Sequence, residues 1–282
     1  MIDASSGEII SKETILARLH QLPVLSAVVH EVIASAKDGQ TDRTHLANRI
    51  SQDQGLSAKV LRVANSPFYG LSRMVGSVHE ATLVLGFNSI RSMALSAALM
   101  LAFPHSASGL FDRRTYWLRS FRVACYTQAL AKCLGQNQEA AFTVGMFYDI
   151  GQLVLDVCIP EQFERMLAQQ KDSGLSLIEI EQSELGFDHA LIGAEMARHW
   201  NFPAEIEHAI YYWRTPEREP FEWNVGMVHV AVLLETGLRG EELIGQIPAT
   251  LCHRMRLTWE GIQAGIPERN HLDEEAKLIL EA

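Results

Sequence analysis

The side chains that could carry chemistry in this sequence are few and widely spaced. Asp149 lies in an otherwise apolar helical stretch, and His189 follows Asp188 at a predicted helix start. Carboxylate and imidazole groups bind divalent cations, and such cations activate water in hydrolases. Histidines elsewhere in the chain form no HExxH or similar arrangement, so we expect surface or packing positions for them.

The cysteines give no sign of a metal or redox motif. Cys125, Cys133, Cys158 and Cys252 form no CxxC pair, and their spacing is irregular. This pattern argues against a zinc ribbon, a thioredoxin-type motif and a disulfide framework. We therefore expect reduced, buried thiols, as in cytoplasmic proteins.

The composition is that of a packed globular protein. Of the 282 residues, 48% are hydrophobic and 21% are charged, which is too apolar for a disordered chain. The formal net charge of −10 disfavours broad nucleic-acid binding but stays compatible with a local basic patch. The apolar stretch 93–103 is too short to cross a bilayer, and residues 1–13 do not resemble an export signal. We expect a cytoplasmic protein without a membrane segment.

The hydrophobic pattern predicts an all-α fold. Apolar residues repeat with helical spacing over most of the chain, and no sustained apolar/polar alternation indicates strands. Ser176 and Glu179 form a predicted capping box, and Asn88 is predicted to cap the helix that follows it. Helices are predicted over residues 26–37, 56–64, 113–134 and 273–280.

A change in composition divides the chain into two helical blocks. Residues 104–112 are rich in small and polar side chains and precede the long helical pattern from Arg113. We predict a subdomain boundary there, with a helical bundle over 1–105 and a second helical subdomain over 106–282. The two subdomains are expected to pack against each other.

Three segments of the first block carry a resemblance to a known family. They read LPVLSAVVHEVIASAKDGQTD from Leu22, LANRISQDQGLSAKVLRVANSPFYG from Leu46 and SVHEATLVLGFNSIRSMAL from Ser77. In this order they resemble the HDOD domain, a bacterial signalling domain related to HD-type metal-dependent phosphohydrolases. The resemblance continues through FYDIGQLVL and GFDHALIGAEMARHWNFPAEIEHAI. It implies that the second subdomain resembles the helical core of an HD phosphohydrolase.

The resemblance also implies where a metal site would lie, and this sequence departs from it. The phosphohydrolase pattern has a first His, an adjacent His-Asp pair, further His residues and a late Asp. These positions hold, in order, Arg119, Tyr148-Asp149, His189, Trp213 with Arg214, and Val232. Only Asp149 and His189 remain as weak candidate ligands, and arginine cannot coordinate a metal. The resemblance therefore implies a vestigial site without catalysis, bound metal or cofactor.

Asp149 and His189 each admit more than one interpretation. We favour an ion pair in which the Arg119 guanidinium supplies the lost positive charge, with a nitrogen within about 4 Å of an Asp149 oxygen. Alternatively, Asp149 is a residual metal ligand, faces solvent or accepts hydrogen bonds from backbone amides. For His189, a hydrogen-bonded interior position is favoured over a ligand role.

Aromatic residues accompany the expected site. Tyr148, Tyr211, Tyr212 and Trp213 are expected to fill the space that the related enzymes keep for a metal. Alternatively they form a pocket for a nucleotide or another planar ligand, whose phosphate would meet a nearby arginine.

A helix stop at residues 65–70 places Phe68 beside Tyr69 in a loop. These rings either pack onto the core or, if exposed, mark a contact surface for another protein.

Together these features favour a non-catalytic regulatory protein, or pseudoenzyme, that acts through contacts with other signalling proteins. A divergent metal-dependent phosphohydrolase is one alternative. The other is a sensor that binds a nucleotide or small molecule in the former active-site cavity. The sequence does not indicate the signal, the partner or the oligomeric state.

Overall fold

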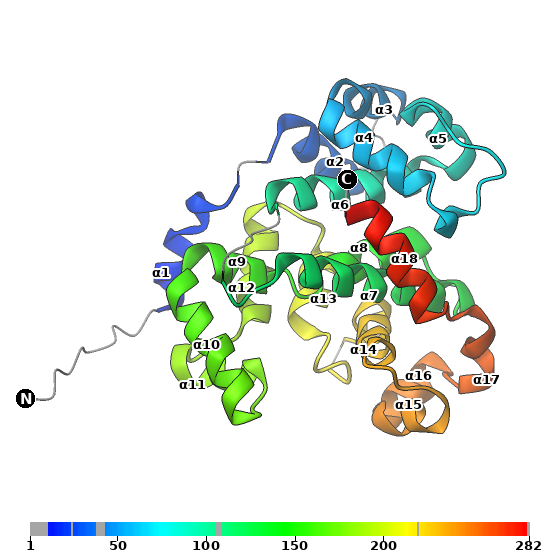
Figure 1. Cartoon of the computed structure of the whole chain (residues 1–282). Coiled ribbons are helices and arrows are strands. Elements are labelled where there is room, and N and C mark those ends of the chain that lie inside the picture. The colour runs from blue at the N-terminus through cyan, green and yellow to red at the C-terminus, as the bar shows by residue number, and fades with distance from the viewer. Residues whose placement is uncertain (1–10, 24, 38–42, 105–108, 219, 281–282) are drawn as a thin grey trace, which may run out of the picture.

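The regular elements of the protein are helical. The computed structural model describes residues 11–23, 25–37, 43–104, 109–218 and 220–280, and no strand occurs among them (Figure 1). The predicted all-α class is therefore confirmed. Up to residue 104 the elements are α1 (Lys12–Ala17), η1 (Leu19–Gln21), α2 (Ala27–Lys37), α3 (Arg43–Gln52), α4 (Gln54–Ala64), η2 (Pro67–Tyr69), α5 (Val78–Leu85) and α6 (Phe87–Ala102), where η marks a 3-10 turn.

The remaining elements follow residue 109. They are α7 (Arg113–Cys133), α8 (Gln138–Phe147), α9 (Gly151–Cys158), α10 (Pro160–Ser173), α11 (Leu177–Leu185), α12 (His189–His199), α13 (Ala204–Tyr212), α14 (Trp223–Glu235), α15 (Gly240–Gln246), α16 (Ala249–Met255), α17 (Trp259–Ile262), η3 (Gln263–Gly265) and α18 (Arg269–Leu280).

Two helices organise the packing. In the first bundle, α2, α4 and α5 pack on α6, which is buried along most of its length and also meets α8. In the second half, α7 lies against α8, α14 and α18, and it buries Trp117 and Tyr126 completely. Because α6 and α7 are apolar on several faces, each can serve as a central helix for its neighbours.

Two glycines let α9 and α12 approach each other. A Cβ on Gly151 would overlap the carbonyl oxygen of His189, and a Cβ on Gly193 would lie 2.9 Å from the backbone nitrogen of Gly151. Any larger side chain would push the helices apart. This close contact brings Asp149, which precedes α9, next to His189, which begins α12.

Contacts join the two halves at both ends of the chain. Helix α1 packs on α12, and Arg18 donates a hydrogen bond from Nη1 to the carbonyl oxygen of Cys158 at 2.9 Å. Helix α18 packs on α7 and also touches α4 and η2 of the first bundle. The boundary at residue 105 stays a prediction, and the N- and C-terminal helices make contacts across it.

The helix ends follow the sequence in most places. Ser176 and Glu179 form the complete capping box, and α7 begins at the predicted residue. The predicted cap at Asn88 is wrong, because α6 already begins at Phe87 after Gly86. Gly86 has φ +84°, a conformation that glycine adopts without the penalty of a Cβ, and it ends α5 and starts α6 in one step.

One apolar run has the length and composition of a membrane-spanning helix. Residues 138–158 have a mean hydropathy of 1.3 over a window of which 83% is buried inside the protein. They form α8 and α9, which pack against α7 and α12, as expected of core helices. All four cysteines are free; Cys125 and Cys158 are buried, whereas Cys133 is exposed, contrary to the expected burial.

Candidate functional site

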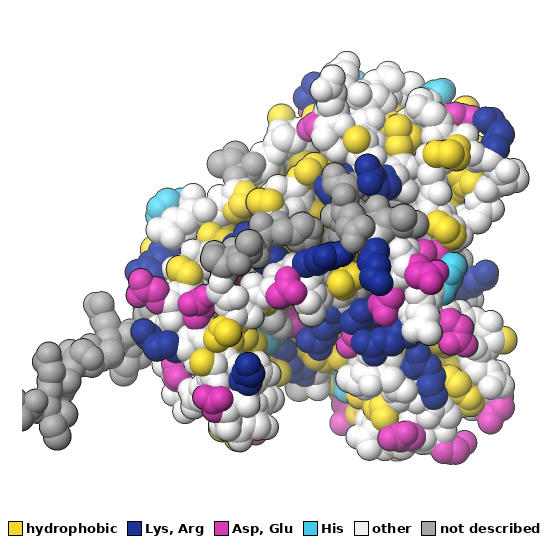
Figure 2. Space-filling model, viewed as in Figure 1, with side chains coloured by type: hydrophobic (Ala, Val, Ile, Leu, Met, Phe, Trp, Pro, Cys, Tyr) yellow, Lys and Arg dark blue, Asp and Glu magenta, His cyan; other side chains and the backbone are white. Residues whose placement is uncertain are grey.

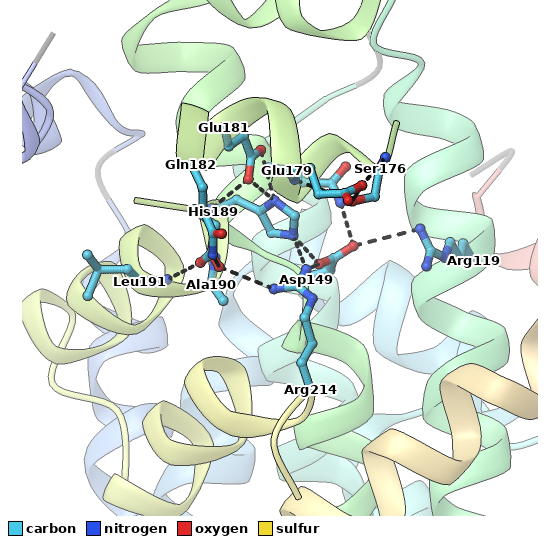
Figure 3. A network of polar contacts seen from close by, with 12 residues as sticks. Arg119, Asp149, Ser176, Glu179, Glu181, Gln182, His189, Ala190, Leu191 and Arg214 are labelled. Carbon is cyan, nitrogen blue, oxygen red and sulfur yellow. Dashed lines mark hydrogen bonds and ion pairs between the residues drawn. The ribbon is translucent and has the colours of Figure 1, made fainter. Parts of the chain in front are cut away.

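Four elements bring the predicted site residues together. Arg119 lies on α7, Asp149 in the turn between α8 and α9, His189 at the first position of α12, and Arg214 just after α13 (Figure 3). Asp188 caps α12 by accepting hydrogen bonds from the amides of Ala190 and Leu191. This cap fixes the start of α12 and hence the backbone position of His189.

The centre of the site is a buried histidine held between two carboxylates. Nε2 of His189 lies 2.8 Å from Oδ1 of Asp149, and Nδ1 lies 2.7 Å from Oε2 of Glu181. Glu181 also accepts a hydrogen bond from the His189 backbone amide at 2.9 Å. None of the three side chains is more than 3% exposed. The predicted interior, hydrogen-bonded position of His189 is confirmed.

This arrangement favours a protonated His189. Burial by itself lowers the pKa of the imidazole, but the charges of Asp149 and Glu181 and their hydrogen bonds outweigh it and raise the pKa to about 9. Burial likewise raises the pKa of Asp149, yet the charge and hydrogen bond of His189, with help from Arg119 and Arg214, bring it to about 2. At neutral pH the pair is therefore an imidazolium and a carboxylate.

Arg214 closes the site from the loop side. Its Nη2 lies 3.7 Å from Oδ1 of Asp149 and 2.6 Å from Nε2 of His189, and its Nη1 lies 4.0 Å from Asp188. The contact with His189 is a hydrogen bond only if Nε2 carries no proton. Oδ1 of Asp149 lies near both nitrogens, at 3.7 Å from Nη2 of Arg214 and 2.8 Å from Nε2 of His189, so this carboxylate offsets positive charge on both side chains.

Arg119 makes the predicted contact with Asp149. Its Nη1 lies 3.8 Å from Oδ2 of Asp149, inside the predicted limit, and its Nε lies 3.6 Å from Oε2 of Glu235. The side chain as a whole is 40% exposed, although its Nε is buried, and both ionic contacts are long. The second oxygen of Asp149 is satisfied mainly by Gln152, whose Nε2 lies 2.5 Å from Oδ2.

The ionic contacts continue from Arg119 to the C-terminal helix. Glu235 on α14 pairs with Arg122 of α7 at 2.6 Å and with Arg269 of α18 at 3.4 Å. Arg122 also pairs with Asp273 of α18 at 2.7 Å. Opposite charges therefore alternate from Asp149 to α18, the helix that touches the first bundle.

The residues at this site do not fit a divalent cation. Both nitrogens of His189 and both oxygens of Asp149 are engaged by other side chains, and two guanidinium groups lie 3.8 Å and 3.7 Å from the Asp149 oxygens. Glu181 binds the opposite nitrogen of the ring, so the two carboxylates and the imidazole do not converge on one point. Among the described residues, no three His, Cys, Asp or Glu side chains are grouped to hold a metal.

The predicted aromatic residues divide into two groups. Tyr148 is buried in the interior beside the site, and the partly buried Trp213 meets it edge to face, with 5.3 Å between the ring centroids. Tyr211 is exposed, contrary to the expectation that it fills the interior, and it contacts Tyr212 on the outer side of α13. Helix geometry explains the difference, because successive residues point in different directions.

An open groove lies outside the buried site. It has a volume of about 680 Å³ and lies between α11, α12 and α13. Phe187, Tyr211, Tyr212, Asp188 and Arg214 contribute to its walls. Arg214 therefore connects the groove to the buried carboxylates, although Asp149 and His189 do not line it.

In the loop at residues 65–70, the structure supports the interpretation that Tyr69 packs onto the core. This side chain is partly buried against the core, and burial strongly raises the pKa of its hydroxyl. The side chain of Phe68 lies outside the described part of the chain.

Sequence reasoning missed two partners at the centre. Glu181 and Gln152 complete the hydrogen bonding of His189 and Asp149, yet neither was predicted to contact these two residues. Glu181 occupies an inward position of α11 among apolar neighbours such as Ile180 and Leu177. A charged residue on the buried face of a predicted helix was the available signal.

Similarity to known proteins identifies the family of this chain. The chain matches the HDOD domain family over residues 22–216, which is more than half of its length. It belongs to the HDOD family. The HDOD match covers the first bundle from Leu22 and extends through α13 to the groove.

Solved structures share the HDOD fold over almost the whole chain. A Shewanella amazonensis protein provisionally named a phosphohydrolase is 26% identical, with a TM-score of 0.80 over 97% of this chain and 100% of that one. A Geobacter sulfurreducens HDOD domain protein of unknown function is 21% identical, with a TM-score of 0.69 over 95% and 90%. In sequence, an uncharacterised Treponema pallidum protein is 22% identical over 88% of this chain, which spans 48% of that protein's length.

Proposed function

We propose that this HDOD protein is a non-catalytic, cytoplasmic regulator that acts through contacts with other signalling proteins. The observation that carries the proposal is the cage around Asp149, in which His189, Arg119 and Arg214 supply positive charge from side chains. A hydrolase of the related type needs a cation that activates water and binds phosphate oxygens. In this protein, side chains neutralise the Asp149 carboxylate without a metal cation. Four free cysteines are consistent with a reducing compartment.

Turnover measurements test the absence of catalysis. The purified chain is assayed with p-nitrophenyl phosphate and bis(p-nitrophenyl) phosphate in the presence of Mn²⁺ or Mg²⁺. We expect no hydrolysis above that of Asp149→Asn, a variant that removes the carboxylate charge but keeps its shape. Metal-dependent turnover that Asp149→Asn abolishes would establish the alternative of a divergent phosphohydrolase, which the name of the Shewanella relative supports.

A second candidate function is the sensing of a small molecule. The groove of about 680 Å³ favours it, because aromatic walls and one arginine suit a planar ligand with an anionic group. A ligand that binds only the folded protein raises the unfolding temperature. Thermal shift with AMP and GMP tests this function, with Tyr212→Ala as the variant that removes part of the aromatic wall. No shift with either nucleotide would leave nucleotide sensing without support.

A further inference from the structure

The first bundle carries an exposed apolar patch on α5 and the loop before it. Met74 is 78% exposed, Leu83 74% and Val84 54%, and the first two are the most exposed large hydrophobic side chains among the described residues. We call these three residues the α5 patch. Exposed aliphatic side chains are common singly, whereas a group of them at one place marks a contact surface.

Two interactions hold the α5 patch in a fixed shape. Asn65 donates a hydrogen bond to the carbonyl oxygen of Val75 at 2.9 Å and accepts one from its amide at 2.7 Å. Val75 is buried, so the adjacent Met74 is presented outward on an anchored backbone. Such a surface loses little conformational entropy on binding, because its backbone is already ordered.

An ion pair brings the loop and the helix face together. Glu80 lies three and four residues before Leu83 and Val84, hence on the same face of α5. Glu80 pairs with Arg73 at 2.6 Å and accepts a hydrogen bond from the Gly76 amide at 2.8 Å. Arg73 precedes Met74, so this pair ties the backbone next to Met74 to the face of α5 that displays Leu83 and Val84.

The surroundings of the patch are basic although the chain is acidic. Residues 22–104 hold seven Lys or Arg and five Asp or Glu, a net charge of +2. The rest of the chain holds the other 17 basic and 29 acidic residues, a net charge of −12. Figure 2 shows this division: few acidic side chains lie on the upper bundle, and many lie on the lower half.

Arginines stand near both ends of α5. Arg73 is held at the N-terminal end by Glu80, and it remains 74% exposed. Arg43 stacks over Phe87, the second residue after the C-terminal end of α5, at 5.8 Å from the ring centroid. The apolar centre is therefore bracketed by two guanidinium groups along about 12 Å of helix.

We propose that the α5 patch is the docking surface for an amphipathic helix of a partner protein, with acidic residues flanking its apolar stripe. The inference rests on the proposed regulatory function and names its surface. Aliphatic side chains receive the apolar stripe, and the arginines at the two ends pair with the carboxylates. A second copy of this chain is disfavoured, because two α5 patches would bring basic bundles face to face. Nucleic acid is disfavoured by the aliphatic centre, which offers no contact to phosphate.

The test begins with three full-length variants of the chain. Leu83→Glu places a negative charge in the α5 patch, and Val84→Glu does so one residue further on. Leu175→Glu is the matched control, since this leucine is 46% exposed in the acidic half of the molecule. Circular dichroism and thermal melting check that all three fold like the wild type.

The proteins that wild type and each variant retain from the native organism are compared by quantitative mass spectrometry. An acidic amphipathic segment of any retained partner is then synthesised as a peptide. We expect wild type and Leu175→Glu to bind the peptide equally, and both α5 variants to bind it at least about tenfold more weakly. Binding should also weaken as salt rises, because the flanking charges are exposed.

Other outcomes overturn the docking surface. A partner retained equally by all variants would refute this surface while leaving the regulatory function in place. Binding of anionic phospholipid vesicles or duplex DNA that depends on Leu83 would identify a different occupant and contradict the proposal. A dimer that depends on Leu83 would do the same. Metal-dependent hydrolysis with no dependence on the patch would remove the regulatory function itself.

Discussion

The charge of His189 makes the stability of this protein depend on pH in a definite direction. The pKa of its imidazole is about 9 in the folded chain, against an ordinary value near 6.5. A group whose pKa is raised by folding stabilises the fold fully below its unfolded pKa and loses that contribution as pH rises through its folded pKa. The difference of about 2.5 units corresponds to about 3 kcal/mol, lost mainly between about pH 6.5 and pH 9.

Denaturant unfolding at a series of pH values between about 6 and 10 measures this loss. His189→Gln is the matched control, because glutamine keeps hydrogen-bonding capacity but cannot titrate. The control is needed because burial also raises the pKa of Cys125 and Tyr148, and these groups destabilise the fold at high pH in both proteins. We expect the wild type to lose about 3 kcal/mol more than His189→Gln. Parallel curves for the two proteins would refute the buried imidazolium.

Three further changes have expected outcomes in the same unfolding assay. Arg119→Met should lower the free energy of unfolding by about 1 kcal/mol or less, because the side chain is 40% exposed and its contacts are long. Arg122→Met should lower it by about 3 kcal/mol, since its 2.6 Å and 2.7 Å pairs are largely buried. Equal losses for the two variants would contradict this ranking. Asn65→Ala removes two hydrogen bonds and should cost about 2 kcal/mol while speeding amide exchange in the loop that it anchors. Gly151→Ala should lower the free energy of unfolding by about 3 kcal/mol or more, because its Cβ would overlap the His189 carbonyl. If this variant were as stable as the wild type, α9 and α12 would not be in close contact.

The sequence predicts the long elements and their caps well because their signals are local. The helix predicted over 113–134 is α7, and Asp188 caps α12 as expected from a short acidic side chain before a helical pattern. The predicted cap at Asn88 is wrong because α6 starts earlier, directly after Gly86. The positive φ angle of Gly86 makes this start possible, and the spacing of hydrophobic residues does not predict such an angle.

The candidate site is predictable only in part, because its geometry depends on contacts between distant segments. Positions taken from the family resemblance place Arg119 opposite Asp149, and the structure has this contact. The same reasoning cannot find Glu181, which reaches His189 from another helix. It also cannot distinguish the inward Tyr148 from the outward Tyr211, since that depends on how α8 and α13 are rotated in the fold.

The metal content of the folded protein shows whether side chains or a divalent cation neutralise Asp149. Wild type and Asp149→Asn are purified without chelator, incubated with Mn²⁺, desalted and measured by plasma mass spectrometry. Because side chains take the place of a divalent cation at this site, we expect far less than one metal ion per chain and no difference between the two proteins. One tightly held Mn²⁺ per wild-type chain that is absent from Asp149→Asn would contradict this expectation.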